Sequence, residues 1–160
     1  MAEARIFQDL KQDHDRHREL LEKLGETSGD SRDRRSLFET LRRELQAHAA
    51  AEEESLYATM LGCPDLREDA RHSVSEHKEI DDMLGELVET DMGSGGWLMK
   101  FKAMRHRYLH HIDEEEEEMF PAAAQGLSSD AEKRIAAIFE KRKPQEIARA
   151  ADELPGDARE

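Results

Sequence analysis

Apolar residues recur at steps of three and four along four long segments of this 160-residue chain, and this spacing limits the possible folds more than any other feature. None of the segments alternates apolar and polar residues with the period of two that strands show. The periodicity therefore predicts an all-α chain. The segments cover, in order, residues 4–24, about 31–61, 64–91 and 97–121.

Short runs of turn residues separate these segments, for example Met92-Gly93-Ser94-Gly95-Gly96. Helices of this length joined by short loops favour an antiparallel up-down-up-down four-helix bundle. Asp30 or Ser31 is predicted to cap the second helix, and Pro64 suits the first turn of the third.

A short extra helix is predicted after the bundle. Ser128 or Ser129 caps it, and it is expected to pack on the bundle as a lid through Ile135, Ile138 and Phe139. Beyond Lys143, two prolines and weak periodicity predict a partly ordered tail. The predicted division is therefore 1–142 for the bundle with its packing helix and 143–160 for the tail.

The charge of the chain limits its partners. The formal net charge is −14, which repels nucleic acids and anionic membranes and attracts cations. The lone Cys63 excludes an intramolecular disulfide and a thiolate cluster, so any metal must be held by histidines and carboxylates. The chain has no apolar run that spans a bilayer and no secretory signal, which predicts a cytoplasmic protein. Its oligomeric state is left open.

An internal repeat places the histidines. His14 precedes His48 by the same interval as His77 precedes His111, and a glutamate lies one helical turn after the second histidine of each pair. One constant shift along the chain, the interval from His14 to His77, therefore superimposes one half of the chain on the other. It maps three residues on three others: His14, His48 and Glu52 on His77, His111 and Glu115.

These six residues lie on the apolar stripes of their helices, which points them into the core. Only His111 and Glu115 follow the stripe of the last long helix, so His110 is predicted to face outward. Buried carboxylates are costly unless a cation balances them. The six residues suit iron, manganese, zinc or copper, and they can hold two ions if each takes two histidines and both glutamates bridge.

At these residues the sequence resembles the hemerythrin family, specifically the bacterial hemerythrin-like HHE cation-binding proteins, over residues 4 to about 124. The resemblance implies a four-helix bundle with a carboxylate-bridged non-haem di-iron centre that binds dioxygen or related small molecules. Oxygen-carrying members have a second histidine one turn before the third-helix histidine, where this chain has Ser73. They also use an aspartate five residues after the fourth-helix histidine, whereas this chain has Glu115 four residues after His111. These departures favour redox or peroxide chemistry, sensing or iron handling over reversible oxygen carriage.

Three functions remain open. The first is a protein with two iron ions and a bridging oxo or hydroxo group that binds dioxygen, peroxide or nitric oxide, with or without weak catalase-like or peroxidase-like turnover. The alternative is iron storage or delivery, which the acidic surface favours. The third is a structural module in which the histidines only pack.

Several further residues have an open role. His17 is either an extra ligand or a packing residue, and Tyr108 either meets a bound oxygen species or iron, or is a core residue. Asp81 is a candidate partner for an imidazole. His72, His106 and His110 lie off the stripes, and the last two either form a surface zinc site or belong to a solvated face.

Overall fold

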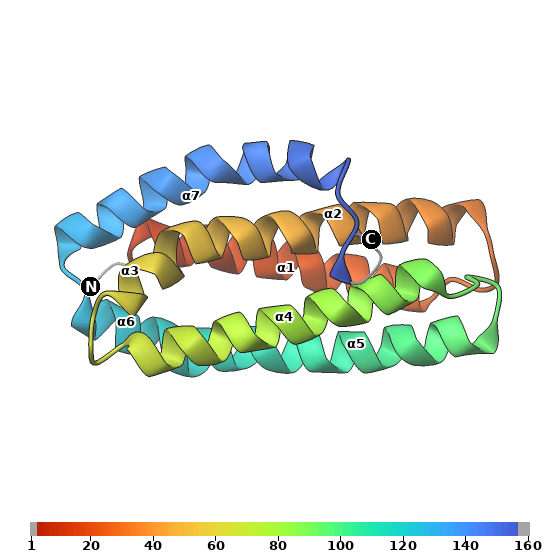
Figure 1. The fold of residues 1–160 in the computed structure, drawn as a ribbon, viewed down its shortest axis with the longest axis horizontal. Coiled ribbons are helices and arrows are strands. Elements are labelled where there is room, and N and C mark those ends of the chain that lie inside the picture. The colour runs from red at the N-terminus through yellow and green to blue at the C-terminus, as the bar shows by residue number, and fades with distance from the viewer. Residues whose placement is uncertain (1–2, 157–160) are drawn as a thin grey trace.

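Long helices lie side by side in the computed structural model, which describes residues 3–156 (Figure 1). The chain reverses direction at the end of each, and within the described residues it forms no strand. The all-α prediction is therefore confirmed. The long helices of the bundle are α1 (Arg5–Gly25), α2 (Arg32–Glu52), α4 (Arg67–Glu89) and α5 (Gly95–Glu114).

Serine side chains open two of these helices and the last one. The hydroxyl oxygen of Ser31 accepts a hydrogen bond from the backbone N–H of Arg34, and Ser94 and Ser128 act in the same way before α5 and the last helix. The prediction that Pro64 lies in the first turn of the third helix is wrong. Pro64 lies in a turn, and α4 begins at Arg67.

Two helices continue through a wider, π-helical turn. After α2 the chain forms η1 (Glu53–Tyr57) and α3 (Ala58–Leu61), and after α5 it forms η2 (Glu115–Met119) and α6 (Phe120–Gly126). Such a turn holds one extra residue and re-aims the side chains around it, which is common at functional sites. Both π-helical turns lie beside the predicted glutamate ligands.

Two apolar clusters fill the bundle and leave a polar layer between them. Along α1, Leu10 belongs to one cluster and Leu21 to the other, while His14 and His17 lie between. The other helices follow the same order, so the predicted ligands lie at mid-bundle with apolar side chains above and below. This arrangement shields the polar layer from water at both of its ends.

The last helix is longer than predicted. Helix α7 (Ser129–Ala150) continues through Pro144 and packs along α2 and α1, so the predicted boundary at residue 143 falls inside it (Figure 1). Periodicity is weak here because the buried face carries small and polar residues, such as Glu146 and Ala150.

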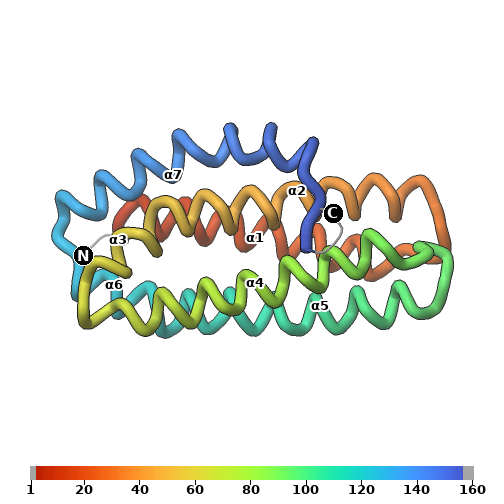
Figure 2. Tube along the Cα trace, viewed as in Figure 1, coloured from red at the N-terminus to blue at the C-terminus, as the bar shows by residue number. Residues whose placement is uncertain are grey.

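The end of α7 is held by contacts from other helices. The buried guanidinium of Arg42 donates hydrogen bonds to the carbonyl oxygens of Ala150 (3.1 Å) and Glu153 (3.0 Å). The chain then crosses α2 toward α4, where the backbone N–H of Gly156 donates to the Asp81 carboxylate at 2.9 Å (Figure 2). Residues 157–160 of the predicted tail lie outside the described residues. Among the described helices, none is both long and apolar enough to cross a membrane.

Candidate metal centre

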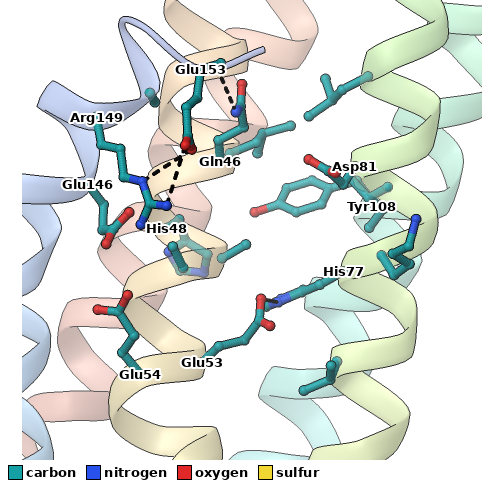
Figure 3. Close-up of a pocket in the computed structure, with 18 residues that line it drawn as sticks. Gln46, His48, Glu53, Glu54, His77, Asp81, Tyr108, Glu146, Arg149 and Glu153 are labelled. Atoms are coloured by element: carbon teal, nitrogen blue, oxygen red, sulfur yellow. Dashed lines mark hydrogen bonds and ion pairs between the residues drawn. The ribbon is translucent and has the colours of Figure 1, made fainter. Parts of the chain in front are cut away.

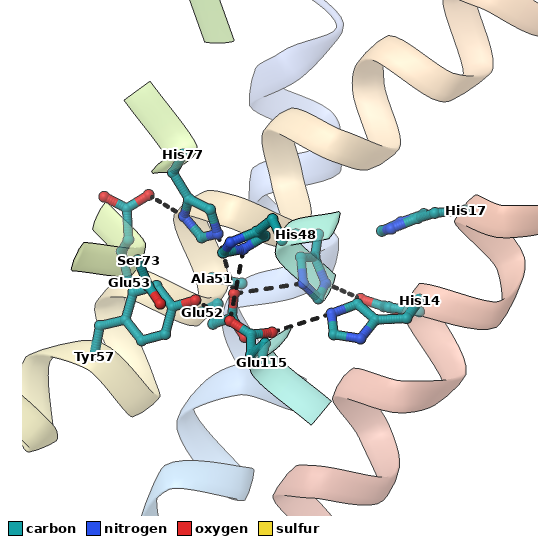
Figure 4. Close-up of polar contacts among 12 residues, drawn as sticks. His14, His17, His48, Ala51, Glu52, Glu53, Tyr57, Ser73, His77 and Glu115 are labelled. Atoms are coloured by element: carbon teal, nitrogen blue, oxygen red, sulfur yellow. Dashed lines mark hydrogen bonds and ion pairs between the residues drawn. The ribbon is translucent and has the colours of Figure 1, made fainter. Parts of the chain in front are cut away.

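The structure brings all six predicted ligand residues together in the core, where each is at most 7% exposed (Figure 4). They form two groups, in each of which the potential ligand atoms lie within 4.8 Å of one another. Both groups contain Glu52 and Glu115. One adds His14 and His48, and the other adds His77 and His111. Two donor clusters therefore share a pair of carboxylates.

Each histidine turns its Nε2 atom toward one of the shared carboxylates. The Nε2 atom of His48 lies 3.5 Å from Glu52 Oε1, and that of His77 lies 3.2 Å from the same oxygen. His14 Nε2 lies 3.2 Å from Glu115 Oε1, and His111 Nε2 lies 3.7 Å from Glu115 Oε2. The four imidazoles thus surround the two glutamates.

Each histidine also binds a second, outer carboxylate through its Nδ1 atom. The outer carboxylates come from helices other than that of the histidine they hold, and three of them are at the rim of the core. An N–H at Nδ1 leaves the Nε2 lone pair directed inward, which is the tautomer that a metal requires. The pairs are His14 with Glu116 (2.6 Å), His48 with Asp13 (2.8 Å), His77 with Glu53 (3.0 Å) and His111 with Glu76 (2.9 Å).

These outer carboxylates are not among the ligands predicted from the sequence, although the internal repeat includes them. The same constant shift along the chain maps Asp13 on Glu76 and Glu53 on Glu116. Each is also the chain neighbour of a predicted ligand, so extending the repeat by one position would have found all four. Asp81, the partner proposed from the sequence, instead accepts the hydrogen bond from Gly156.

Several inward-facing polar atoms of the six residues have no hydrogen-bond partner within the described part of the chain. They are His14 Nε2, His48 Nε2, both oxygens of Glu52 and Glu115 Oε1. Buried acceptors without donors cost free energy unless a cation binds them. Imidazole nitrogens and carboxylate oxygens together fit a first-row transition metal. The donor set therefore fits a pair of such ions.

The local charges favour a cation in the same place. Burial lowers the pKa of His14, but the carboxylates of Glu115 and Glu116 outweigh it and raise this pKa to about 9. Burial also lowers the pKa of His77, but the carboxylates of Glu52 and Glu53 outweigh it and raise this pKa to about 10. Without a metal, protons on these imidazoles balance the carboxylates, and a bound metal replaces them.

Tyr57 adds a phenol to one side of the site. Its buried hydroxyl donates a hydrogen bond to Glu115 Oε2, and burial followed by the charges of Glu115 and Glu52 raises its pKa well above the ordinary value. The internal repeat aligns Tyr57 with Phe120, so the second half of the site has no hydroxyl at the equivalent position. Tyr57 is not among the site residues predicted from the sequence.

His17 and Tyr108 lie next to the six residues and bind each other. His17 Nδ1 and the Tyr108 hydroxyl share a hydrogen bond of 2.7 Å, and burial lowers the pKa of His17 to about 3, which keeps this imidazole neutral. His17 lies outside the two groups that share the glutamates, and it clusters with Asp13 and His48 instead.

The off-stripe histidines face outward, as predicted. His110 is 61% exposed, whereas His111 is 2% exposed. His110 Nε2 lies 3.2 Å from the Glu114 carboxylate.

A helical bundle that encloses paired histidine and glutamate clusters defines a class of metal-binding proteins, and comparison with known proteins gives the family. The model of the hemerythrin HHE cation-binding domain matches residues 5–123. The chain belongs to this family.

Relatives of the chain occur in mycobacteria. The chain is 30% identical over 123 residues to the uncharacterized proteins Rv2633c of Mycobacterium tuberculosis and Mb2666c of Mycobacterium bovis, which covers 77% of this chain and 74% of each relative. Its fold is similar to the crystal structure of a hemerythrin HHE cation-binding domain-containing protein, the Rv2633c homolog from Mycobacterium kansasii. That comparison has a TM-score of 0.80 and 26% identity, and covers 94% of this chain and 91% of the other.

Proposed function

We propose that this protein is a non-haem di-iron protein that binds dioxygen, peroxide or nitric oxide in the core of the bundle. The observation that carries the proposal is the sharing of Glu52 and Glu115 by two histidine pairs, because shared carboxylates are suited to bridging two ions. His14 and His48 would hold one ion, and His77 and His111 the other. Two adjacent iron ions supply two-electron chemistry with small oxygen-containing molecules.

Two histidines and two shared carboxylates provide about four of the six ligands that an octahedral ion takes. The remaining positions suit small external ligands. Ser73 occupies the place of an extra histidine of the oxygen carriers, and its hydroxyl binds the Met119 sulfur at 3.2 Å. This favours chemistry or sensing over reversible carriage.

A cavity of about 440 Å³ between α2, α4 and the end of α7 supports access for such ligands (Figure 3). His48, His77 and Tyr108 lie on its wall. Charged side chains, including Arg149 and Glu153, line its outer part, where they form an ion pair of 3.2 Å. A small polar molecule such as peroxide fits this route.

Two phenols near the centre hold protons where a bound oxygen species would need them. Tyr57 donates to Glu115, and Tyr108 shares its hydrogen bond with neutral His17 on the cavity wall. Burial raises the pKa of Tyr108, so the phenol keeps its proton. Positioned proton donors favour peroxide turnover as an activity of this site.

Metal analysis combined with absorption spectroscopy tests the proposal. We expect two irons per chain in protein isolated without chelator, near-ultraviolet bands of an oxidised di-iron centre, and changes in those bands on adding peroxide or nitric oxide. His48→Leu and His111→Leu should abolish the bands, and His106→Leu should not. Colourless, metal-free protein from iron-rich culture would contradict the proposal.

Iron storage or delivery is the alternative that the net charge of −14 favours. It requires more than two irons per chain and their release on reduction, so a fixed content of two excludes it. The cytoplasmic location remains a prediction from the sequence.

A further inference from the structure

A second cluster of metal-binding side chains lies on the surface between α4 and α5. His72 Nε2 lies 3.3 Å from Glu76 Oε1 and 3.3 Å from Glu114 Oε1. These residues form a group whose potential ligand atoms lie within 4.8 Å of one another. The other oxygen of Glu114 lies 3.2 Å from Nε2 of His110, so a second imidazole borders the cluster.

These separations match the ligand shell of one ion. Two donor atoms that each lie about 2.1 Å from a metal are about 3.0 Å apart at adjacent octahedral positions and about 3.4 Å apart in a tetrahedron. The imidazole and the two carboxylates supply both ligand types that first-row divalent ions accept. The side chain of His72 is 58% exposed and that of Glu114 is 32% exposed, which leaves the cluster open to ions from solution.

The surface cluster is connected to the buried centre. Glu76 Oε1, which faces His72, also accepts the hydrogen bond from Nδ1 of His111 at 2.9 Å. A small cleft of about 40 Å³ has His72 and Glu114 on its wall together with His111 and Glu115. Such a volume holds a few water molecules or one ion.

The lining of this cleft favours a cation over a neutral molecule. Besides the residues already named, the carboxylates of Asp69 and Glu118 line it, and none of its lining residues among 3–156 is a lysine or arginine. The larger cavity between α2, α4 and α7 is about 440 Å³ and has His48 and His77 on its wall. The two openings therefore approach the six residues from different sides and differ in size.

We propose that His72, Glu76 and Glu114 form a capture site for a divalent first-row transition-metal ion, from which iron(II) enters the buried centre along the α4–α5 cleft. Binding at the surface stands independently of the proposed di-iron function, whereas the role in loading rests on it. Exposed histidine–carboxylate pairs add little to stability, so variants of His72 and Glu114 should fold normally.

Zinc titration of the iron-loaded protein tests the capture site. Isothermal titration calorimetry should show one Zn²⁺ per chain bound beyond the iron. The double variant His72→Ala/Glu114→Gln should weaken this binding roughly tenfold or more, since two of three ligands are lost. The matched control is His106→Ala/Glu117→Gln, which changes an exposed histidine and an exposed glutamate of α5 and η2 and should bind Zn²⁺ like the wild type.

Equal Zn²⁺ binding by both double variants would overturn the capture site. The two double variants can still be compared if the protein holds no buried iron, because the His72/Glu114 variant should still bind the surface Zn²⁺ at least tenfold more weakly than the wild type and the control do. Failure of the proposed function and failure of this inference therefore give different results.

Loading kinetics test the route. Apoprotein prepared with a chelator is mixed with iron(II), and the near-ultraviolet bands are followed after addition of oxygen. We expect the His72→Ala/Glu114→Gln variant to reach the same final iron content at a rate at least fivefold lower, with an unchanged melting temperature. A rate equal to that of the wild type would overturn the route through the α4–α5 cleft.

Discussion

The Nδ1 atom of His14 on α1 binds the Glu116 carboxylate in the π-helical turn η2 at 2.6 Å, across 102 positions of sequence. Three further imidazoles are held in the same way, so each of the four histidines of the candidate centre is bound by a carboxylate outside the two donor groups that share Glu52 and Glu115.

Removal of one outer carboxylate should weaken metal binding without removing a ligand. We expect Glu116→Gln to lower metal affinity by roughly 10-fold to 100-fold, because the imidazole of His14 loses the charge that orients it and raises its basicity. Competition with a chromophoric chelator measures the affinity. Glu117→Gln, at the exposed neighbouring position, is the control, and equal affinities of the two variants would contradict a role for Glu116.

Metal removal should destabilise the bundle. An ion present at about 100 times its dissociation constant stabilises the folded state by about 3 kcal/mol, which corresponds to roughly 6–12 °C in melting temperature for a chain of this size. Thermal unfolding with and without chelator measures the effect. His48→Leu should lose the response to chelator, and an unchanged response would show that the ion binds elsewhere.

The phenol of Tyr57 should matter more to stability than that of Tyr108. Tyr57→Phe removes a hydrogen bond to the buried Glu115 carboxylate, which should cost about 1.5–3 kcal/mol in the metal-free protein, whereas Tyr108→Phe removes a bond to neutral His17 and should cost about 0.5–1.5 kcal/mol. Urea unfolding measures both free energies. Equal losses would contradict the stronger hydrogen bond expected for Tyr57.

The metal-free protein should lose stability at alkaline pH. The pKa values of His14 and His77 are about 9 and about 10 in the folded protein, above the unfolded value of about 6.5. Protons on these imidazoles therefore stabilise the fold fully below about pH 6.5, and this contribution disappears as the pH rises through about 9 to 10.

Melting temperatures between about pH 7 and 10.5 test this dependence. The metal-loaded protein is the control, because ions replace the protons on His14 and His77 in it and the rest of the chain is the same. The melting temperature of the metal-free form should fall more steeply with pH than that of the metal-loaded form. Parallel curves for the two forms would contradict the prediction.

The sequence could predict the helices and the residues that meet in the core because both depend on local periodicity. A residue on the apolar stripe faces the core wherever the helix packs, so His48 and Glu52 point inward together, as His111 and Glu115 do. The internal repeat then selects His111 over its neighbour His110 without any knowledge of coordinates.

Only the tertiary structure decided which groups from different helices meet. The pairing of His48 with Asp13, or of His72 with Glu114, depends on the rotation and register of one helix against another, which packing of the whole core sets. The end of α7 likewise meets Arg42 of α2, which donates hydrogen bonds to the carbonyl oxygens of Ala150 and Glu153. Stripe positions are fixed by the 3.6-residue turn of a single helix, whereas cross-helix contacts need the assembled bundle, so the sequence determined the first and the fold determined the second.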